Sequence, residues 1–369
     1  MKKRTGARPG LKMNISLLSA FEFPDQLNVI IASCGKYGDE IYCRYFDMYM
    51  HELGEPFKSV VFPEYNVHCV RREGAVFISL SDTPMGVHEH PVPITDRTQA
   101  EPTHFLSVCL SPFHGKEQKW LLLSELLEHY KLQGATYFYL YSKYIDEYTN
   151  ILLHDYVRTG EAEVIVLHTR FQEIDPKFPR YWHYLQLQEC LTRARGHSHW
   201  VAFVDLDERI TPTDYPGTLS DYLKSITDEK IGGILFRQRW ILVNEKTPHI
   251  YRNNKQVATW MPTWRYHNTS HVGPPGNTAK FVVDPKKALI VNIHFVEKFF
   301  EGYSMYEMEP SEGVVRHYRD VNSGKWGQIW LKVVEKMGNF SMTNYPEKWM
   351  DRLRLNVQKR LHYVYGDQH

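Results

Sequence analysis

Several features that would assign a chain to a common class are missing from this 369-residue sequence. No apolar stretch approaches the ~20 residues that a membrane-spanning helix requires. Lysine and arginine number 44 against 43 aspartates and glutamates, so the chain has no basic field to attract a nucleic acid. Neither GxGxxG nor GxxxxGK[ST] occurs, which argues against dinucleotide-binding and P-loop chemistry.

Cysteine is also sparse and widely spaced. The five cysteines form no CxxC pair, which excludes a zinc ribbon, and their odd number leaves at least one thiol unpaired in a monomer: Cys34, Cys43, Cys69, Cys109 and Cys190. Three Asn-x-Ser/Thr sequons begin at Asn14, Asn268 and Asn339. Together these features favour a secretory lumen as the location of the chain.

The most informative stretch is WVAFVDLDERI, residues 200–210. Its first five residues have the length and composition of a fully buried strand, and three carboxylates follow at once. In extended backbone Asp205 and Asp207 project to the same side, while Leu206 points back into the protein. Two such carboxylates suit one Mn²⁺ or Mg²⁺ ion whose remaining positions go to water and a substrate diphosphate. An exposed turn of acidic residues is the alternative.

The order of predicted elements divides the chain into four parts. Residues 1–24 are predicted to be a flexible leader, and 25–100 a small β-rich subdomain of short strands broken by glycine and proline. Residues 101–325 alternate strand and helix in a βαβαβ pattern, which predicts a mostly parallel sheet with helices on both faces. Residues 326–369 are predicted to be helices that pack on this domain.

In such a sheet a nucleotide binds beyond the carboxyl ends of the strands. The predicted strands end near Ser111, near Asp146 and at residues 168–170. Ser111 and Asp146 are therefore candidate nucleotide-sugar contacts.

Several stretches in the correct order resemble glycosyltransferase family 92, a metal-dependent family of the GT-A type. The stretches cover about residues 100–320 and are HFLSVCLSPFHG, LLEHYKLQGATYFYLYS, QECLTRARGHSHWVAFVDLDERI, KFVVDP, VNIHF and RHYRD. Arg209 departs from the pattern, because an aromatic residue often follows DLDE there.

The resemblance implies a Rossmann-like GT-A fold and an inverting enzyme that moves galactose from UDP-galactose to a hydroxyl of a glycan acceptor, in a β-linkage. It also implies a Golgi lumenal protein held by a single N-terminal, type II anchor that this chain does not contain. The acceptor would be an N-glycan of a glycoprotein or a polysaccharide.

The resemblance adds His317 as a third metal ligand beside Asp205 and Asp207. Arg319 is a candidate phosphate contact because a guanidinium matches phosphate geometry, and Lys280 and His294 are further candidate donor contacts. Inversion needs a base that deprotonates the acceptor hydroxyl, and the eligible carboxylates are Glu208, Glu307 and Glu309. Glu208 has an alternative role as a group that orients a metal ligand.

Two other functions fit part of the sequence. A haloacid dehalogenase type phosphatase also places DxD after an apolar strand, but its DxD belongs near the start of the domain and is followed by a small hydroxyl residue. A non-catalytic glycan-binding protein on the same fold would usually have lost one aspartate of the pair, and both are present here.

Overall fold

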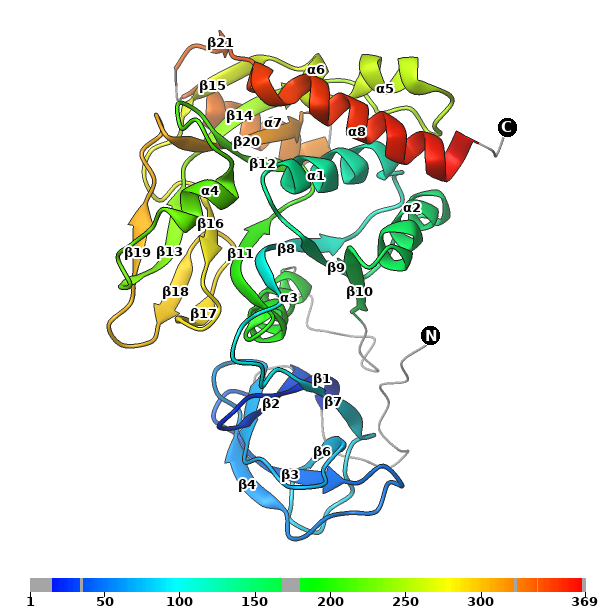
Figure 1. The fold of residues 1–369 in the computed structure, drawn as a ribbon, viewed down its shortest axis with the longest axis vertical. Coiled ribbons are helices and arrows are strands. Elements are labelled where there is room, and N and C mark those ends of the chain that lie inside the picture. Colours follow the sequence, from blue (N-terminus) through cyan, green and yellow to red (C-terminus); the bar gives the residue numbers. More distant parts are fainter. Residues whose placement is uncertain (1–14, 34–35, 168–179, 322–323, 337, 367–369) are drawn as a thin grey trace.

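The computed structural model describes residues 15–33, 36–167, 180–321, 324–336 and 338–366. It is an α/β protein with a β-rich N-terminal part below a larger part in which helices cover a central sheet (Figure 1). No described helix is long and apolar enough to cross a membrane. The predicted α/β class is therefore confirmed, although the chain contains more sheet than its sequence indicated.

The N-terminal part is a seven-stranded sheet in the order β4-β3-β6-β7-β1-β2-β5. Its edges meet, because a bridge joins Val61 to Val67 beside β4 and β5, and Figure 1 shows the strands as a ring. The Cys43–Cys69 disulfide links β3 to β5 inside its apolar core. We call this part the barrel. Its strands are β1 (Ile15–Glu22), β2 (Leu27–Ser33), β3 (Glu40–Phe46), β4 (Phe57–Val60), β5 (Asn66–Cys69), β6 (Phe77–Ser81) and β7 (Val92–Asp96).

The barrel corrects the prediction of a flexible leader through residue 24. Residues Ile15–Glu22 form β1, which pairs with both β2 and β7 and is buried along nearly its whole length. The strand was missed because it is buried on both faces and so lacks the alternation of apolar and polar residues that marks a half-buried strand. Residues 1–14 lie outside the described part of the chain, as do Cys34 and the sequon asparagine Asn14.

The central sheet has the order β10-β9-β8-β11-β16-β13-β19, and only β16 runs antiparallel to its neighbours. The chain moves outward from β8 to β9 and β10 and then returns to place β11 on the other side of β8. Its strands are β8 (His104–Phe113), β9 (Tyr137–Ser142), β10 (Ala162–Val166), β11 (Ser198–Val204), β13 (Ile231–Phe236), β16 (Lys280–Val283) and β19 (Ser304–Glu307). The space between β8 and β11 at their carboxyl ends is where ligands bind in sheets of this kind.

Helices cover both faces of this sheet, as the sequence pattern predicts. The first face packs against α1 (Trp120–Leu132), α2 (Glu147–Arg158) and the C-terminal α8 (Glu347–Tyr365). The other face packs against α3 (Tyr181–Ala194), which also contacts β1 and β2 of the barrel. The remaining helices are α4 (Leu219–Lys224), α5 (Asn254–Trp260), α6 (Pro262–Arg265) and α7 (Gly324–Glu335).

A second, five-stranded sheet has the order β12-β20-β14-β15-β21 and extends from the central one. Its first strand, β12, begins directly after the DLD turn, so the two sheets meet at the carboxyl end of β11. Its strands are β12 (Glu208–Pro212), β14 (Gln238–Val243), β15 (Asn268–Val272), β20 (Gly313–Asp320) and β21 (Ser341–Met342). Residues 288–299 form a hairpin of β17 (Ala288–Val291) and β18 (Val296–Phe299), with His294 in its turn.

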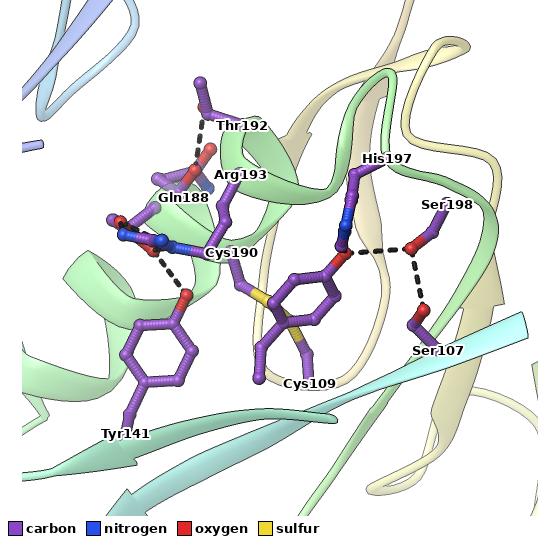
Figure 2. The surroundings of a disulfide bond; sticks show 11 residues. Ser107, Cys109, Tyr141, Gln188, Cys190, Thr192, Arg193, His197 and Ser198 are labelled. Atoms are coloured by element: carbon purple, nitrogen blue, oxygen red, sulfur yellow. Dashed lines mark hydrogen bonds and ion pairs between the residues drawn. A yellow bond between two sulfur atoms is a disulfide. The ribbon is translucent and has the colours of Figure 1, made fainter. Parts of the chain in front are cut away.

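Helix α3 contacts both the barrel and the central sheet. Figure 2 shows the disulfide that ties it to the sheet. The Cys109–Cys190 disulfide ties β8 to α3. Glu189, the residue before Cys190, accepts a hydrogen bond from Ser19 of the barrel at 2.8 Å and pairs with Arg193, one turn further along, at 2.6 Å. Because Glu189 is fully buried and its charge is paired, the barrel is held against α3 as one packed unit.

Candidate functional site

The predicted site residues gather where β8 and β11 end side by side. Val204, the last residue of β11, pairs with Leu110 of β8. Asp205 follows Val204 and Ser111 follows Leu110, so these two residues are neighbours. The Ser111 hydroxyl donates a hydrogen bond to the Asp205 carboxylate. Ser111 is thus confirmed as a neighbour of the DLDE stretch.

The backbone of DLDE is a tight turn and not the extended chain predicted from the sequence. The N–H of Glu208 donates to the carbonyl oxygen of Asp205 at 3.1 Å, and the N–H of Tyr318 donates to that of Asp207 at 2.8 Å. Leu206 packs against the core, as predicted. The side chains of Asp205 and Asp207 remain 29% and 23% exposed, so both are accessible to a ligand.

A buried lysine neutralises the first half of the turn. The Nζ of Lys280 lies 2.9 Å from Asp205 Oδ2 and 3.3 Å from Glu208 Oε2, and its side chain is only 2% exposed. Burial disfavours the charged form of Asp205, but Lys280 outweighs burial and holds the pKa of that carboxyl well below its usual range. Asp205 is therefore an ionised carboxylate that already has a cationic partner.

The second half of the turn is organised by a histidine. His317 Nε2 lies 3.1 Å from Asp207 Oδ2, and its ring packs 4.7 Å from that of Trp240. On its other side, His317 Nδ1 lies 3.2 Å from the Oε1 of Gln238. The amide nitrogen of Gln238 donates to Glu208 at 2.8 Å, so its oxygen faces Thr278 and His317. His317 thus donates its Nδ1 proton to Gln238. Burial disfavours the charged imidazole, but Asp207 outweighs burial and raises the pKa of His317, so Nε2 donates a hydrogen bond to Asp207 and a bound metal ion would take the place of that proton.

This arrangement fits a divalent cation at Asp207 and His317. Two neighbouring ligands of an octahedral ion with bonds of about 2.1 Å lie about 3 Å apart, close to the 3.1 Å between Asp207 Oδ2 and His317 Nε2. Metal-binding histidines also usually donate their second N–H to a carbonyl or carboxylate, which here is Gln238. Gln238 was not identified from the sequence, where nothing distinguishes it within a run of ordinary strand residues.

The full three-residue metal set predicted from the sequence is not assembled. Among the residues with described positions, no group of three or more His, Cys, Asp and Glu side chains is placed to hold a metal ion. The physical reason is that Lys280 occupies the Asp205 carboxylate. Asp207 and His317 come together as predicted, whereas Asp205 belongs to the lysine-centred half of the site.

Arg319 is brought to the same place. Its Nη1 lies 3.6 Å from Asp207 Oδ2, and its side chain is 30% exposed. Its Nε has no hydrogen-bond partner among the described residues. The guanidinium therefore has unused donors, as the predicted phosphate contact requires.

Two histidines complete the surroundings of Asp205. His183, in the first turn of α3, has its Nε2 3.9 Å from Asp205 Oδ1. His294 Nδ1 donates a hydrogen bond to the carbonyl oxygen of Ala279 at 3.2 Å, and the charges of Lys280 and Asp205 act on the ring. Burial lowers the pKa of each histidine to about 4, so both are neutral near pH 7. His183 was missed because helical spacing accounts for α3 as an ordinary amphipathic helix.

Glu208 does not have the surroundings of a base. Its side chain is 1% exposed, and its Oε2 accepts a hydrogen bond from the N–H of Asp205 at 2.8 Å while its Oε1 accepts one from Gln238. A carboxylate enclosed in this way cannot reach an acceptor hydroxyl. The base prediction for Glu208 is therefore wrong, and the orienting role fits, because Glu208 holds both the Asp205 backbone and Gln238.

The other predicted residues lie apart from this cluster. Glu307 lies in register with Phe203 across β16 and β13. Three strand spacings of about 4.8 Å place it about 14 Å from Phe203. Glu307 and Glu309 are exposed at the same sheet edge as Asp205. Asp146 instead caps α2 by accepting a hydrogen bond from the Thr149 N–H at 2.8 Å, so its nucleotide role lacks support. The predicted contact at 168–170 lies outside the described residues.

Comparison with known proteins gives one family. The sequence model of glycosyltransferase family 92 matches residues 104–353. No curated protein matches the chain.

Solved structures give distant similarities. TarS (residues 1–349) of S. aureus is 12% identical, with 72% of this chain and 73% of that chain covered and a TM-score of 0.31. The mannosyltransferase PcManGT from Pyrobaculum calidifontis, solved with GDP-Man and Mn²⁺, is 10% identical, with coverages of 73% and 75% and a TM-score of 0.34.

The buried Glu208 makes a testable contribution to stability. Burial raises the pKa of Glu208 from 4.5 to about 7, so the folded state holds this proton more tightly than the unfolded state. Its contribution to the free energy of unfolding therefore falls as pH rises from about 4.5 to about 7, by at most about 1.4 kcal/mol per pH unit. Glu208→Gln removes this titration. In urea unfolding at several pH values, the stability of the wild type minus that of the variant should decrease across this window. A difference that is constant or increases with pH would contradict the burial of this carboxyl.

Proposed function

This chain belongs to glycosyltransferase family 92, and from that premise we propose that it transfers galactose from UDP-galactose to a hydroxyl of a glycan acceptor, with inversion to a β-linkage. The membership covers residues 104–353 and so includes every residue of the site described above. Membership of this family does not agree with the alternative of a haloacid dehalogenase type phosphatase. The observation that carries the proposal is the pairing of Asp207 with His317 beside Arg319. Gln238 holds the Nδ1 proton of His317, so its Nε2 faces Asp207.

The donor diphosphate would lie against this second half of the turn. Asp207 and His317 are the residues that would hold Mn²⁺ or Mg²⁺, and the bound ion would neutralise charge that develops on the leaving diphosphate. Arg319 donates hydrogen bonds to phosphate oxygens from the same side. The place of these residues just beyond the carboxyl end of β11 supports the proposed GT-A type of fold, in which the nucleotide lies beyond the carboxyl ends of the strands.

The first half of the turn would position the donor. Ser111, His183 and His294 surround Asp205. Neutral His183 can donate one hydrogen bond to the nucleotide sugar, whereas His294 can only accept one at Nε2, because its Nδ1 proton goes to the Ala279 carbonyl. Lys280 keeps Asp205 ionised without a metal. We assign Lys280 to this electrostatic role and not to direct contact with the donor, because its ammonium is buried between two carboxylates.

The acceptor base is proposed to be Glu307 or Glu309. Both are exposed carboxylates at the carboxyl end of the same sheet as Asp205. We also propose the Golgi lumen as the location. The disulfides Cys43–Cys69 and Cys109–Cys190 support an oxidising compartment.

The donor is tested with a panel of UDP-sugars in the presence of Mn²⁺. We expect UDP-galactose to be consumed faster than the others, and EDTA to stop its consumption until Mn²⁺ is restored. Preference for another UDP-sugar would remove the galactose assignment and leave the transferase assignment intact.

Asp207→Ala should lower Mn²⁺-dependent consumption of UDP-galactose by about 100-fold or more, because a charge-stabilising group aimed at the leaving diphosphate is lost. Circular dichroism should show an unchanged fold. The matched control is Asp228→Asn, an exposed carboxylate that precedes β13 at the opposite edge of the same sheet, and it should retain full activity. An undiminished rate in the Asp207 variant would remove the metal hypothesis.

Gln238→Ala should weaken Mn²⁺ binding by about 10- to 100-fold, because His317 loses the group that fixes its tautomer. The activity of this variant should recover at high Mn²⁺ concentration. Titration of activity against Mn²⁺ separates this effect from a general loss of structure, which added metal would not reverse. Gln358→Ala, on the exposed side of α8, serves as the control.

Glu307→Gln and Glu309→Gln test the base. The variant that lacks the base should lose about 10²- to 10⁴-fold in kcat while the KM for UDP-galactose stays near the wild-type value. If both variants keep the wild-type kcat, neither residue deprotonates the acceptor.

A further inference from the structure

Two of the three sequons lie on one edge of the second sheet, although 71 residues separate them in sequence. Asn268 is the first residue of β15, and its partner across the ladder is Met342 of β21. Asn339 lies two residues before β21. Both asparagines are exposed. The fold thus brings two candidate acceptors of an N-linked glycan to a single place.

The two sequons differ in how the folded protein presents them. In Asn339-Phe340-Ser341 the serine is exposed. In Asn268-Thr269-Ser270 the serine is 1% exposed, and its Oγ accepts a hydrogen bond from the Trp240 N–H at 3.0 Å. Asn268 would therefore have to be modified before β14 and β15 pair, whereas Asn339 stays available in the folded chain.

The edge itself has a property that a glycan would change. β21 contains only two residues, pairs with β15 alone and ends the sheet. Met342 on this strand is 72% exposed. An edge strand is a template for pairing with another chain, and proteins protect such edges by charge, proline, a covering element or short length. Of these devices β21 itself has only its short length, because it consists of Ser341 and Met342.

We propose that Asn339 and Asn268 carry N-linked glycans, and that these glycans keep the β21 edge from pairing with a second chain. The ligand class is the precursor oligosaccharide of the secretory pathway, attached to the asparagine side chain. This inference rests on the secretory location in the proposed function and is independent of the transfer reaction.

The test uses the whole chain behind a secretion signal in mammalian cells, with Asn14→Gln in every protein so that only two sequons remain. Digestion with peptide-N-glycosidase F should shift the mobility of the parent by two glycans. Asn339→Gln and Asn268→Gln should each remove one of these shifts, and the double variant should show none. Asn356→Gln, in α8 and outside any sequon, should leave both shifts. Absence of any shift in the parent overturns the proposal.

Shielding is tested by size-exclusion chromatography of the secreted proteins. The double variant should contain more oligomer than the parent, and adding Met342→Lys to it should restore the monomer, because a charge on an edge strand opposes pairing. A double variant that stays as monomeric as the parent overturns the shielding role. UDP-galactose consumption by the parent is measured separately, so a failure of the transferase assignment is distinguishable from a failure of this one.

Discussion

The buried ammonium of Lys280 is the charge on which the site depends. It lies within 3.3 Å of two carboxylates, Asp205 and Glu208, that are packed together at the end of a buried strand. Two carboxylates so close in a buried place cannot both ionise without a counter-charge. Glu208 in turn accepts a hydrogen bond from the Asp205 backbone and another from Gln238, which orients His317. One cation therefore supports both halves of the DLDE turn.

The site combines residues from strands far apart in sequence, because the strand order of the sheet changes direction between β8 and β11. β8 supplies Ser111, β11 and β12 flank the turn, β16 supplies Lys280 and β20 supplies His317 and Arg319. The carboxyl ends of β8 and β11 meet at the switch between outward and return crossings, which is where ligands bind in sheets of this kind. The second sheet begins at the same point, so β20 can approach Asp207 from the side opposite Lys280.

Helix α3 connects this site to the barrel. His183 near its beginning faces Asp205, and Glu189 and Arg193 further along bind Ser19 and pack on Phe21 of the barrel. The Cys109–Cys190 disulfide fastens the middle of the same helix to β8 (Figure 2). The barrel therefore packs against the helix that places His183 beside Asp205.

The sequence by itself determined the βαβαβ order, the buried strand before DLDE and the family, because these depend on local periodicity and on motifs in a fixed order. The sequence and the family resemblance also named a set of site residues that the structure brings together, with the exception of Asp146, which caps α2: Asp205, Asp207, His317, Ser111, Lys280, His294 and Arg319. Only the tertiary structure decided that Lys280 holds Asp205, that Glu208 is enclosed and orients its neighbours, and that Gln238 and His183 belong to the site. Those outcomes depend on distances between β11, β14, β16 and α3, and side-chain contacts between distant segments leave no periodic pattern along the chain.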